Sequence, residues 1–211
     1  MSKLNVVALS ERALTVGSLS LDAARSYADH LRESGGWQDV VQGLDSVTVS
    51  FDPMQITPNE ARARLEGQLQ TVAVLRGSMP GELIELYAEY GGEAGPDLEP
   101  VAARLGMSAE DVVQRHTSVS YSVAVIGFTP GFAYLSGLDE KLRVPRLSEP
   151  RLRVPPGSIA IAGAFTGVYP MSSPGGWSII GRTTSKLVDP FTDDPFVLSV
   201  GQQVRFISSP C

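Results

Sequence analysis

Four arginines able to bind an anion lie among turns in residues 127–183: Arg146, Arg151, Arg153 and Arg182. A guanidinium offers a planar fork of N–H donors that matches a carboxylate or a phosphate. Prolines and glycines around these arginines restrict or permit particular backbone angles, so the side chains are held on rigid loops. We expect a site for a small acid or a phosphate here. The alternative is that these arginines pair with acidic residues nearby in the sequence.

Aromatic residues and a pair of glycines share this segment. Tyr134, Tyr169 and Trp177 can form the floor of a small-molecule pocket, or they can be core residues of a β-rich domain. Gly175 and Gly176 can bring backbone amides close to a ligand, or they can form a tight turn. Both interpretations stay open at the level of sequence.

His116 lies near the end of a predicted helix and is the candidate for proton transfer. Its imidazole titrates close to neutral pH, as a general acid or base requires. A cation at a helix C-terminus is also stabilising, so a capping role is the alternative. His30 is expected on the exposed face of an earlier helix.

The composition excludes several classes of function. A net charge of −6 is unfavourable for nucleic acid, and no apolar run approaches the length of a membrane span. The only cysteine is Cys211, so no disulfide can form within the chain and a cytoplasmic location is expected. With two histidines and one cysteine, no metal site is expected. The sequence contains no phosphate loop, dinucleotide fingerprint or biotin-attachment signature.

Residues 1–90 are predicted to form a ferredoxin-like domain, because their pattern follows the order strand, helix, strand, strand, helix, strand. The second helix has a clear start, since Thr57-Pro58-Asn59-Glu60 is a capping box with proline at the first helical position. The predicted strands are residues 14–19, 37–42, 47–51 and 82–87, and the helices begin near Leu21 and Pro58.

Residues 91–211 are predicted to form a second domain, which begins at a glycine-rich stretch. Two short helices come first, one beginning after Asp97 as its cap and one after Ser108. Short strands with Gly/Pro punctuation follow, which is typical of an antiparallel barrel or sandwich. The last two, residues 196–200 and 203–207, flank Gly201-Gln202 and are predicted to form a hairpin.

Several specific motifs occur in one order across the second half of the chain. With these motifs the sequence resembles the family of KipI and the 5-oxoprolinase B subunit (PxpB), also called allophanate hydrolase subunit 1. The matching residues are the stretches 90–98, 127–138, 154–158 and 173–183, the pairs Pro145-Arg146, Pro150-Arg151 and Tyr169-Pro170, and His116.

The resemblance implies an α+β protein with an N-terminal α/β sandwich domain and a C-terminal cyclophilin-like antiparallel β-barrel. It also implies a subunit of a hydrolase complex that is inactive alone. This chain would be the B subunit of an ATP-dependent 5-oxoprolinase, which opens 5-oxoproline to glutamate. The expected partners are a KipA/PxpC-type subunit on a separate polypeptide and a PxpA-type subunit. ATP would be used by the complex, and no metal or biotin site is expected in this chain.

The family has two other activities, which remain alternatives. One is a carboxyltransferase component of a urea or allophanate pathway, which needs a biotinylated protein from elsewhere. The other is a KipI-like inhibitor of a sensor histidine kinase, which needs a docking surface and no ATP.

Residue chemistry and membership of these motifs together assign the roles in the expected enzyme. Three residues are candidate catalytic groups, two to hold an anion and one to move a proton: Arg146, Arg182 and His116. Six residues are candidate substrate-binding groups: Tyr134, Arg151, Tyr169, Gly175, Gly176 and Trp177.

Overall fold

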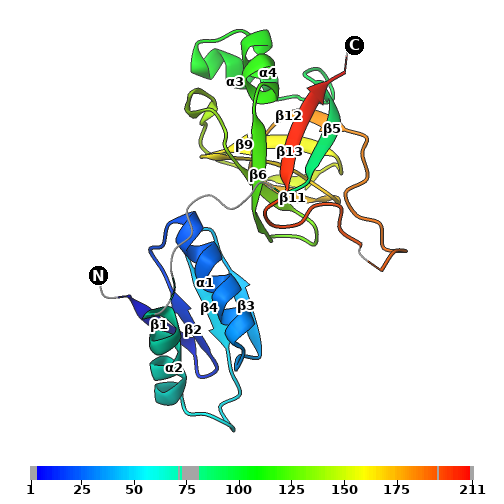
Figure 1. Cartoon of the computed structure of the whole chain (residues 1–211). Coiled ribbons are helices and arrows are strands. Elements are labelled where there is room, and N and C mark those ends of the chain that lie inside the picture. Colours follow the sequence, from blue (N-terminus) through cyan, green and yellow to red (C-terminus); the bar gives the residue numbers. More distant parts are fainter. Residues whose placement is uncertain (1–3, 71, 73–80, 194, 210–211) are drawn as a thin grey trace. The chain divides into compact units, whose positions relative to one another are not determined.

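A computed structural model describes residues 4–70, 72, 81–193 and 195–209. The chain divides into two compact units, Met1–Ser78 and Met79–Cys211, and each is described by itself (Figure 1). Cys211 lies outside the described residues.

The N-terminal unit is one four-stranded antiparallel sheet with two helices on one face. The strand order is β1-β2-β4-β3. Alternate strand residues such as Leu14 and Val49 pack against Ala28 and Leu65 of the helices to form its core. The elements are β1 (Val6–Ser10), β2 (Ala13–Val16), α1 (Leu21–Ser34), β3 (Asp39–Gln42), β4 (Val47–Ser50) and α2 (Pro58–Gln70).

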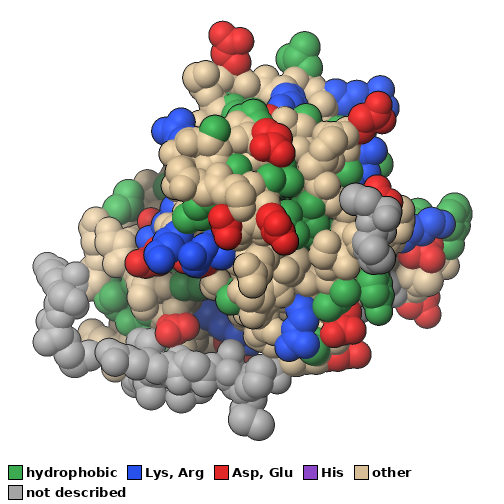
Figure 2. All heavy atoms as spheres, turned by 90° about the horizontal axis from the view of Figure 1, so that it is seen from above, with side chains coloured by type: hydrophobic (Ala, Val, Ile, Leu, Met, Phe, Trp, Pro, Cys, Tyr) green, Lys and Arg blue, Asp and Glu red, His purple; other side chains and the backbone are tan. Residues whose placement is uncertain are grey.

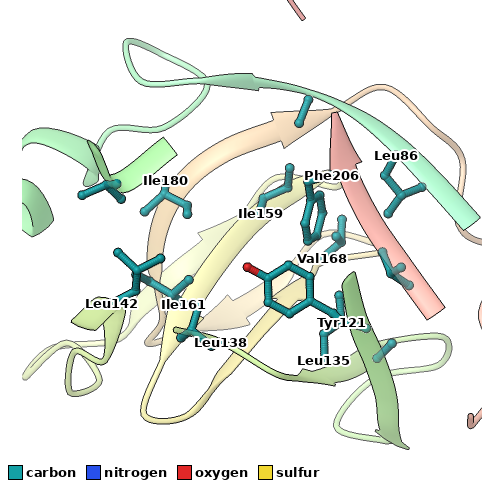
Figure 3. Packing of buried hydrophobic residues seen from close by; sticks show 14 of the residues in the cluster. Leu86, Tyr121, Leu135, Leu138, Leu142, Ile159, Ile161, Val168, Ile180 and Phe206 are labelled. Carbon is teal, nitrogen blue, oxygen red and sulfur yellow. The ribbon is translucent and has the colours of Figure 1, made fainter. Parts of the chain in front are cut away.

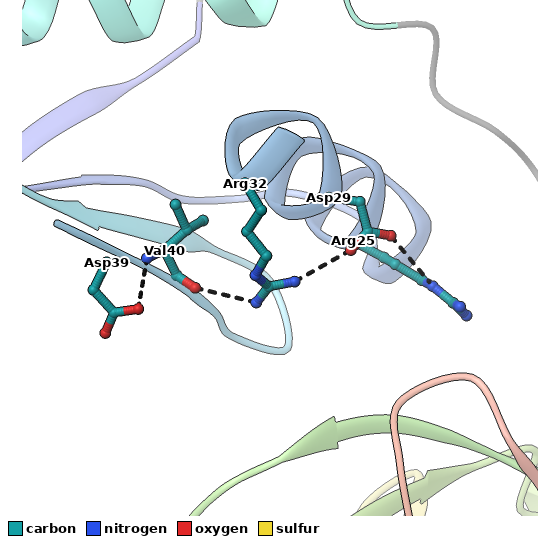
Figure 4. A network of polar contacts seen from close by, with 5 residues as sticks. All are labelled: Arg25, Asp29, Arg32, Asp39 and Val40. Atoms are coloured by element: carbon teal, nitrogen blue, oxygen red, sulfur yellow. Dashed lines mark hydrogen bonds and ion pairs between the residues drawn. The ribbon is translucent and has the colours of Figure 1, made fainter. Parts of the chain in front are cut away.

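Side-chain caps begin both helices of this unit. The Ser20 hydroxyl accepts a hydrogen bond from the backbone of α1. The predicted capping box of α2 is confirmed, because Thr57 N–H donates to Glu60 at 2.8 Å and Glu60 N–H donates to the Thr57 hydroxyl at 3.3 Å. Arg32 then joins α1 to the sheet, since it donates both to Asp29 and to the carbonyl of Val40 (Figure 4).

The predicted ferredoxin-like strand order differs from the structure at its first and last strands. β1 (Val6–Ser10) was not predicted, because only Val6 of its five residues is buried and the strand shows no alternation. β1 pairs with β2 at the edge of the sheet. The strand expected to close this domain, residues 82–87, belongs to the second unit instead. The predicted boundary after residue 90 therefore lies too late, since the units divide after Ser78.

The second unit is built on a closed seven-stranded barrel with the order β10-β7-β6-β13-β5-β12-β9. The barrel confirms the mixed α+β class with a β-barrel. One pair departs from the antiparallel expectation, because β13 and β5 run parallel over six residue pairs. The barrel strands are β5 (Leu83–Tyr90), β6 (Ser120–Ile126), β7 (Ala133–Ser136), β9 (Ser158–Ala162), β10 (Phe165–Val168), β12 (Ser178–Thr183) and β13 (Gln203–Ser208).

The interior of the barrel is filled by large apolar side chains from its strands and loops. Tyr121 and Phe206 are fully buried at its centre and meet edge to face, with ring centroids 5.6 Å apart (Figure 3). The other labelled core residues are Leu86, Leu135, Leu138, Leu142, Ile159, Ile161, Val168 and Ile180. Because side chains fill this space, the barrel is a packed core and its binding surfaces lie outside it.

Two helices and a small sheet complete the unit. α3 (Leu98–Leu105) and α4 (Ala109–Thr117) pack on the barrel core through residues such as Val101 and Val112. Ser108 and Asp111 form a capping box at α4, as the predicted helix start requires. Outside the barrel, β8 (Arg151–Val154) pairs with β11 (Ser173–Gly175), and a short 3-10 helix, η1, spans Glu140–Leu142.

The predicted hairpin of residues 196–200 and 203–207 is wrong. β13 pairs with β5 and β6, so its neighbours come from distant parts of the chain. Phe196 instead forms an isolated antiparallel bridge with Val188. Gly131 accounts for part of this, because a Cβ there would lie 2.8 Å from Val188 and 3.0 Å from the Phe196 ring. The glycine lets this segment pack on the 127–131 loop.

Among the described residues, none of the helices combines the length and the apolar character that a membrane crossing requires.

Candidate functional site

A small pocket on the outside of the barrel gathers the segments that the sequence singled out. Its cavity has a volume of about 240 Å³. Six of the nine candidate site residues line it: Tyr134, Arg146, Tyr169, Gly175, Gly176 and Trp177. Five residues that were not predicted as site residues line it as well: Phe128, Phe132, Leu147, Pro150 and Pro174. We call this cavity the aromatic pocket.

Phe132 lies at the centre of the cluster of rings that lines the aromatic pocket. Its centroid is 5.1 Å from those of Tyr134 and Tyr169, and 5.5 Å from that of Trp177, in edge-to-face geometry each time. Tyr169 and Trp177 are 1% and 5% exposed, so they are wall and core residues at once. The core role left open by the sequence is confirmed for these two residues, and their role in binding a small molecule stays a prediction. Such a wall is rigid and apolar, with few polar atoms.

Gly175 makes room for the Tyr169 phenol. A Cβ at Gly175 would overlap the phenolic oxygen, whereas a Cβ at Gly176 would lie 3.6 Å from Pro150, an ordinary contact. The backbone N–H of Trp177 hydrogen-bonds to the same phenol, while burial raises the pKa of Tyr169. Tyr169 therefore stays neutral near neutral pH and acts as a fixed polar group in the wall.

Arg146 places a positive charge at the aromatic pocket. Pro145 restricts the backbone before it, Val144 C=O accepts from Gly163 N–H at 2.7 Å, and Leu147 N–H donates to Gly176 C=O at 2.7 Å. The guanidinium is near enough to Tyr169 to oppose the rise in the pKa of the phenol. Within the part of the chain that the structure describes, its side chain has no ion pair or hydrogen bond. Its donors are free for a ligand.

Phe128 forms the exposed rim of the aromatic pocket in a strained backbone conformation. Its φ is +75°, a left-handed value that bulky residues rarely adopt, and 61% of its surface is exposed. The ring stacks edge to face on Phe132 at 5.6 Å. Strain of this kind concentrates at functional sites. Phe128 and Phe132 both belong to the 127–138 motif, which was the signal that could have identified them.

Arg151 lies next to the aromatic pocket but does not line it, and its partner was not among those expected. Its guanidinium donates to Asp97 at 2.7 Å, and the second Asp97 oxygen accepts from Ile179 N–H at 2.7 Å. Asp97 therefore joins the loop before α3 to β8 and β12, instead of capping α3 with its side chain. Arg151 positions β8 and the neighbouring Pro150.

Substitution Asp97→Asn is expected to lower the free energy of unfolding of the barrel unit by about 2 kcal/mol, because it leaves the guanidinium of Arg151 without its counter-charge. The two side chains are only 13% and 31% exposed. Trp37 lies in the N-terminal unit, so denaturant unfolding of Trp37→Phe protein, followed through Trp177, measures the change in the barrel unit. Glu140→Gln is the matched control, because its pair with Arg143 is 81% and 48% exposed, and we expect a change below about 0.5 kcal/mol. Equal effects of the two substitutions would contradict the role given to Asp97.

Arg182 lies on β12, away from the aromatic pocket. One terminal nitrogen donates weakly to Glu93 C=O at 3.5 Å, and its buried Nε has no hydrogen-bond partner among the described residues. Its strand neighbour on β9 is Ser158. The structure therefore does not bring Arg182 together with Arg146.

His116 lies on α4, is fully buried against the barrel and does not line the aromatic pocket. Its Nδ1 is 2.8 Å from the Tyr90 hydroxyl and its Nε2 is 2.8 Å from the Thr166 hydroxyl. Thr166 already donates its proton to Ala160 C=O, so Nε2–H of His116 must donate to Thr166 and Tyr90 must donate to Nδ1. Burial lowers the pKa of His116 to about 3. The imidazole is therefore a neutral positioning group joining α4 to β5 and β10.

His116 gives the barrel unit an acid-dependent loss of stability. Its pKa is about 3 when folded and about 6.5 when unfolded, so only the unfolded chain gains this proton as the pH falls below 6.5. Between pH 7 and pH 5 the free energy of unfolding should fall by about 2 kcal/mol through this group alone.

Denaturant titrations of Trp37→Phe protein at several pH values measure this loss, because Trp177 then reports the barrel unit alone. In His116→Gln on the same background, the difference between pH 7 and pH 5 should shrink by that amount. An unchanged pH dependence in the variant would refute the assignment.

Charge and metal-ligand chemistry add little beyond the arginines. Figure 2 shows acidic and basic side chains interspersed on the face that it draws. Across residues 4–70, 72, 81–193 and 195–209, no three His, Cys, Asp or Glu side chains gather closely enough to hold a metal ion. The N–H donors of Arg146 beside the aromatic wall are thus the main polar groups that the aromatic pocket offers to a ligand.

The chain is similar to known proteins over most of its length. Residues 5–198 match the family described as carboxyltransferase domain, subdomain C and D. The chain is 43% identical over 169 residues to the B subunit of 5-oxoprolinase from Escherichia coli O157:H7, covering 80% of this chain and 77% of that protein. It is 39% identical over 211 residues to the B subunit of 5-oxoprolinase from Haemophilus influenzae, covering 97% of each.

Two solved structures have the same fold. The crystal structure of TTHA0988 matches with a TM-score of 0.78 and 32% identity over 95% of this chain. This chain spans only 40% of the length of that protein. Urea carboxylase of Kluyveromyces lactis matches with a TM-score of 0.82 over 98% of this chain and 22% of that protein. The two sequences are 17% identical, so this match shows a shared fold and no more.

The family match covers most of the chain, and the two curated relatives share its length and its sequence at this level of identity. The chain belongs to the carboxyltransferase domain, subdomain C and D family and, within it, to the group of 5-oxoprolinase B subunits.

Proposed function

We propose that this chain is the B subunit of an ATP-dependent 5-oxoprolinase and that the aromatic pocket holds 5-oxoproline. The observation that carries the proposal is the free guanidinium of Arg146 beside a small aromatic wall, in a chain 43% identical to a 5-oxoprolinase B subunit. The substrate is a five-membered lactam with one carboxylate. Its flat ring matches the wall of Tyr134, Phe132 and Trp177, and its carboxylate matches the fork of Arg146.

The size of the aromatic pocket agrees with a substrate of this kind. Its volume of about 240 Å³ is below the range of about 300–1,000 Å³ of pockets that take drug-sized ligands. The neutral Tyr169 phenol provides a hydrogen-bonding group for the lactam amide. Rigid placement by Gly175 and the Leu147–Gly176 hydrogen bond would reduce the entropy lost on binding.

Opening a lactam needs chemical activation. ATP would supply it by phosphorylating the lactam oxygen, with release of ADP. Water would then add to the activated carbon, and the C–N bond would break with protonation of the nitrogen. Hydrolysis of the resulting acyl phosphate by a second water would give glutamate and phosphate. This chain would contribute the orientation of the lactam and positive charge beside it. The roles given to Arg182 and His116 from the sequence are not carried into this proposal as substrate contacts, since neither residue lines the aromatic pocket.

The complex would contain further polypeptides, because the curated relatives are themselves subunits of 5-oxoprolinase. We infer a KipA/PxpC-type subunit and a PxpA-type subunit as partners, and no activity from this chain alone. The remaining catalytic groups, including any proton donor, would then come from the partners.

The test is formation of glutamate from 5-oxoproline and ATP by the co-purified subunits, with each subunit omitted in turn. Loss of glutamate on omission of this chain is the expected result. Full activity without it would refute the proposal.

The carboxyltransferase description of the family favours a second candidate, carboxyl transfer to an amide acceptor. An intact complex that makes no glutamate, but consumes bicarbonate with urea and a biotinylated carrier, would establish that activity instead.

A further inference from the structure

A second hollow adjoins the aromatic pocket at Arg146. Its cavity has a volume of about 450 Å³, and Arg146 and Leu147 line both cavities. Arg104, in the last turn of α3, lines only the second one. One arginine is thus shared, and the other is dedicated to the second hollow.

The lining of the second hollow carries uncompensated positive charge. Arg104 and Arg146 are exposed, and within the described part of the chain neither side chain has an ion pair or hydrogen bond. Among the described residues that line this hollow, Asp97 alone is acidic, and its carboxylate is already paired with Arg151 and with Ile179 N–H at 2.7 Å each. A position at the C-terminus of α3 is favourable for Arg104 but leaves its five N–H donors free.

The polar groups of the second hollow match a phosphoryl group better than they match a carboxylate. Two guanidinium forks and two serines, Ser148 and Ser178, line one cavity. A tetrahedral phosphate has enough oxygens to accept from two arginines at once, which a single carboxylate cannot do as completely. Hydrogen bonds of Val144 and Leu147 fix the backbone on both sides of Arg146, so the base of its side chain is held at the hollow before a ligand arrives.

We propose that the second hollow is a phosphoryl-binding site, with Arg104 as its dedicated ligand and Arg146 shared with the aromatic pocket. The role of this site in the reaction rests on the proposed function, because a phosphoryl group held there would lie next to a lactam held in the aromatic pocket. Arg146 lines both cavities and has five N–H donors, so it can contact the carboxylate of the lactam on one side and the phosphoryl group on the other. The site itself is a property of this chain and can be tested without turnover.

The test is calorimetric titration of the full chain with pyrophosphate at constant ionic strength. Wild-type protein should bind pyrophosphate, and Arg104→Gln should weaken binding about tenfold, the loss of one charged hydrogen-bonding partner. Arg143→Gln is the matched control, because Arg143 pairs with Glu140 and lines neither cavity; its Kd should stay within about twofold of wild type.

Further arms identify the source of the phosphoryl group. If binding of a non-hydrolysable ATP analogue is weakened by Arg104→Gln, the ligand of the site is the phosphoryl donor. If only binding of inorganic phosphate is weakened by this substitution, the ligand is the product. Absence of pyrophosphate binding by the wild-type chain, or equal weakening by Arg104→Gln and Arg143→Gln, overturns the proposal.

The assembled enzyme separates failure of this site from failure of the proposed function. Arg104→Gln should raise KM for ATP and leave KM for 5-oxoproline unchanged. If the complex is active but Arg104→Gln changes neither pyrophosphate binding nor KM for ATP, the phosphoryl site is refuted and the proposed function is not. A complex that makes no glutamate, although pyrophosphate binding depends on Arg104, refutes the function and leaves the site standing.

Discussion

Substitution Arg146→Gln is expected to lower kcat/KM for 5-oxoproline in the assembled enzyme by about 100-fold. Arg146 is a free cation of the aromatic pocket, and two charged hydrogen bonds to a carboxylate are worth about 3 kcal/mol together. The effect on binding is measured directly by titration of 5-oxoproline into the full complex. Arg146→Lys should recover only part of the loss, since an ammonium keeps the charge but not the planar fork.

Arg153→Gln is the control for Arg146→Gln. Arg153 lies on β8, donates to Ser172 at 3.1 Å and lines neither cavity. Its kcat/KM should stay within about twofold of wild type. Wild-type kinetics in Arg146→Gln would rule out the aromatic pocket as the place where this acid is held. An equal loss in Arg153→Gln would instead indicate a general effect of removing positive charge.

Gly175→Val is expected to abolish glutamate formation and to lower the free energy of unfolding of the barrel unit by about 1–3 kcal/mol. A Cβ at position 175 would overlap the phenolic oxygen of Tyr169, so the ring must leave its place beside Phe132. Phe132 in turn contacts Trp177, so the near-ultraviolet circular dichroism of Trp177 should change in the Trp37→Phe background. Activity and this spectrum together separate pocket distortion from global unfolding.

Gly176→Ala is the control for stability and for the Trp177 spectrum. Its added Cβ would lie 3.6 Å from Pro150, which needs no movement of the neighbour. The variant should keep the melting temperature of the wild type. If Gly175→Val kept both the melting temperature and the Trp177 spectrum, the close approach of Gly175 to Tyr169 would not be what shapes the pocket wall.

The aromatic pocket could be predicted from sequence because its residues belong to short, rigid motifs. In the stretches around Tyr134, Arg146 and Trp177, proline and glycine set the backbone locally, so the placement of side chains depends little on distant contacts. Local rules also predicted the capped start of α2 at Thr57 and that of α4 at Ser108, both of which the structure confirms.

Pairings between distant segments were beyond the reach of the sequence. Strand β5 (Leu83–Tyr90) has a strand pattern that is equally compatible with either domain, and only its hydrogen bonds to β12 and β13 assign it to the barrel. Phe196 shows the same limit, since its strand-like surroundings form no hairpin. Residue pattern reports which face of a strand is buried, but not which strand lies beside it.

Residue pattern and motifs were enough to predict the mixed α+β class, the barrel, the family and six of the residues that line the aromatic pocket. Which arginine is free depends on the folded chain. Arg151 is matched by Asp97, 54 residues earlier in the chain, Arg182 lies elsewhere on β12, and Arg146 keeps its donors available. The physical reason is that a charge is neutralised by whichever opposite charge or dipole the fold brings within about 4 Å, and that distance is independent of separation along the chain.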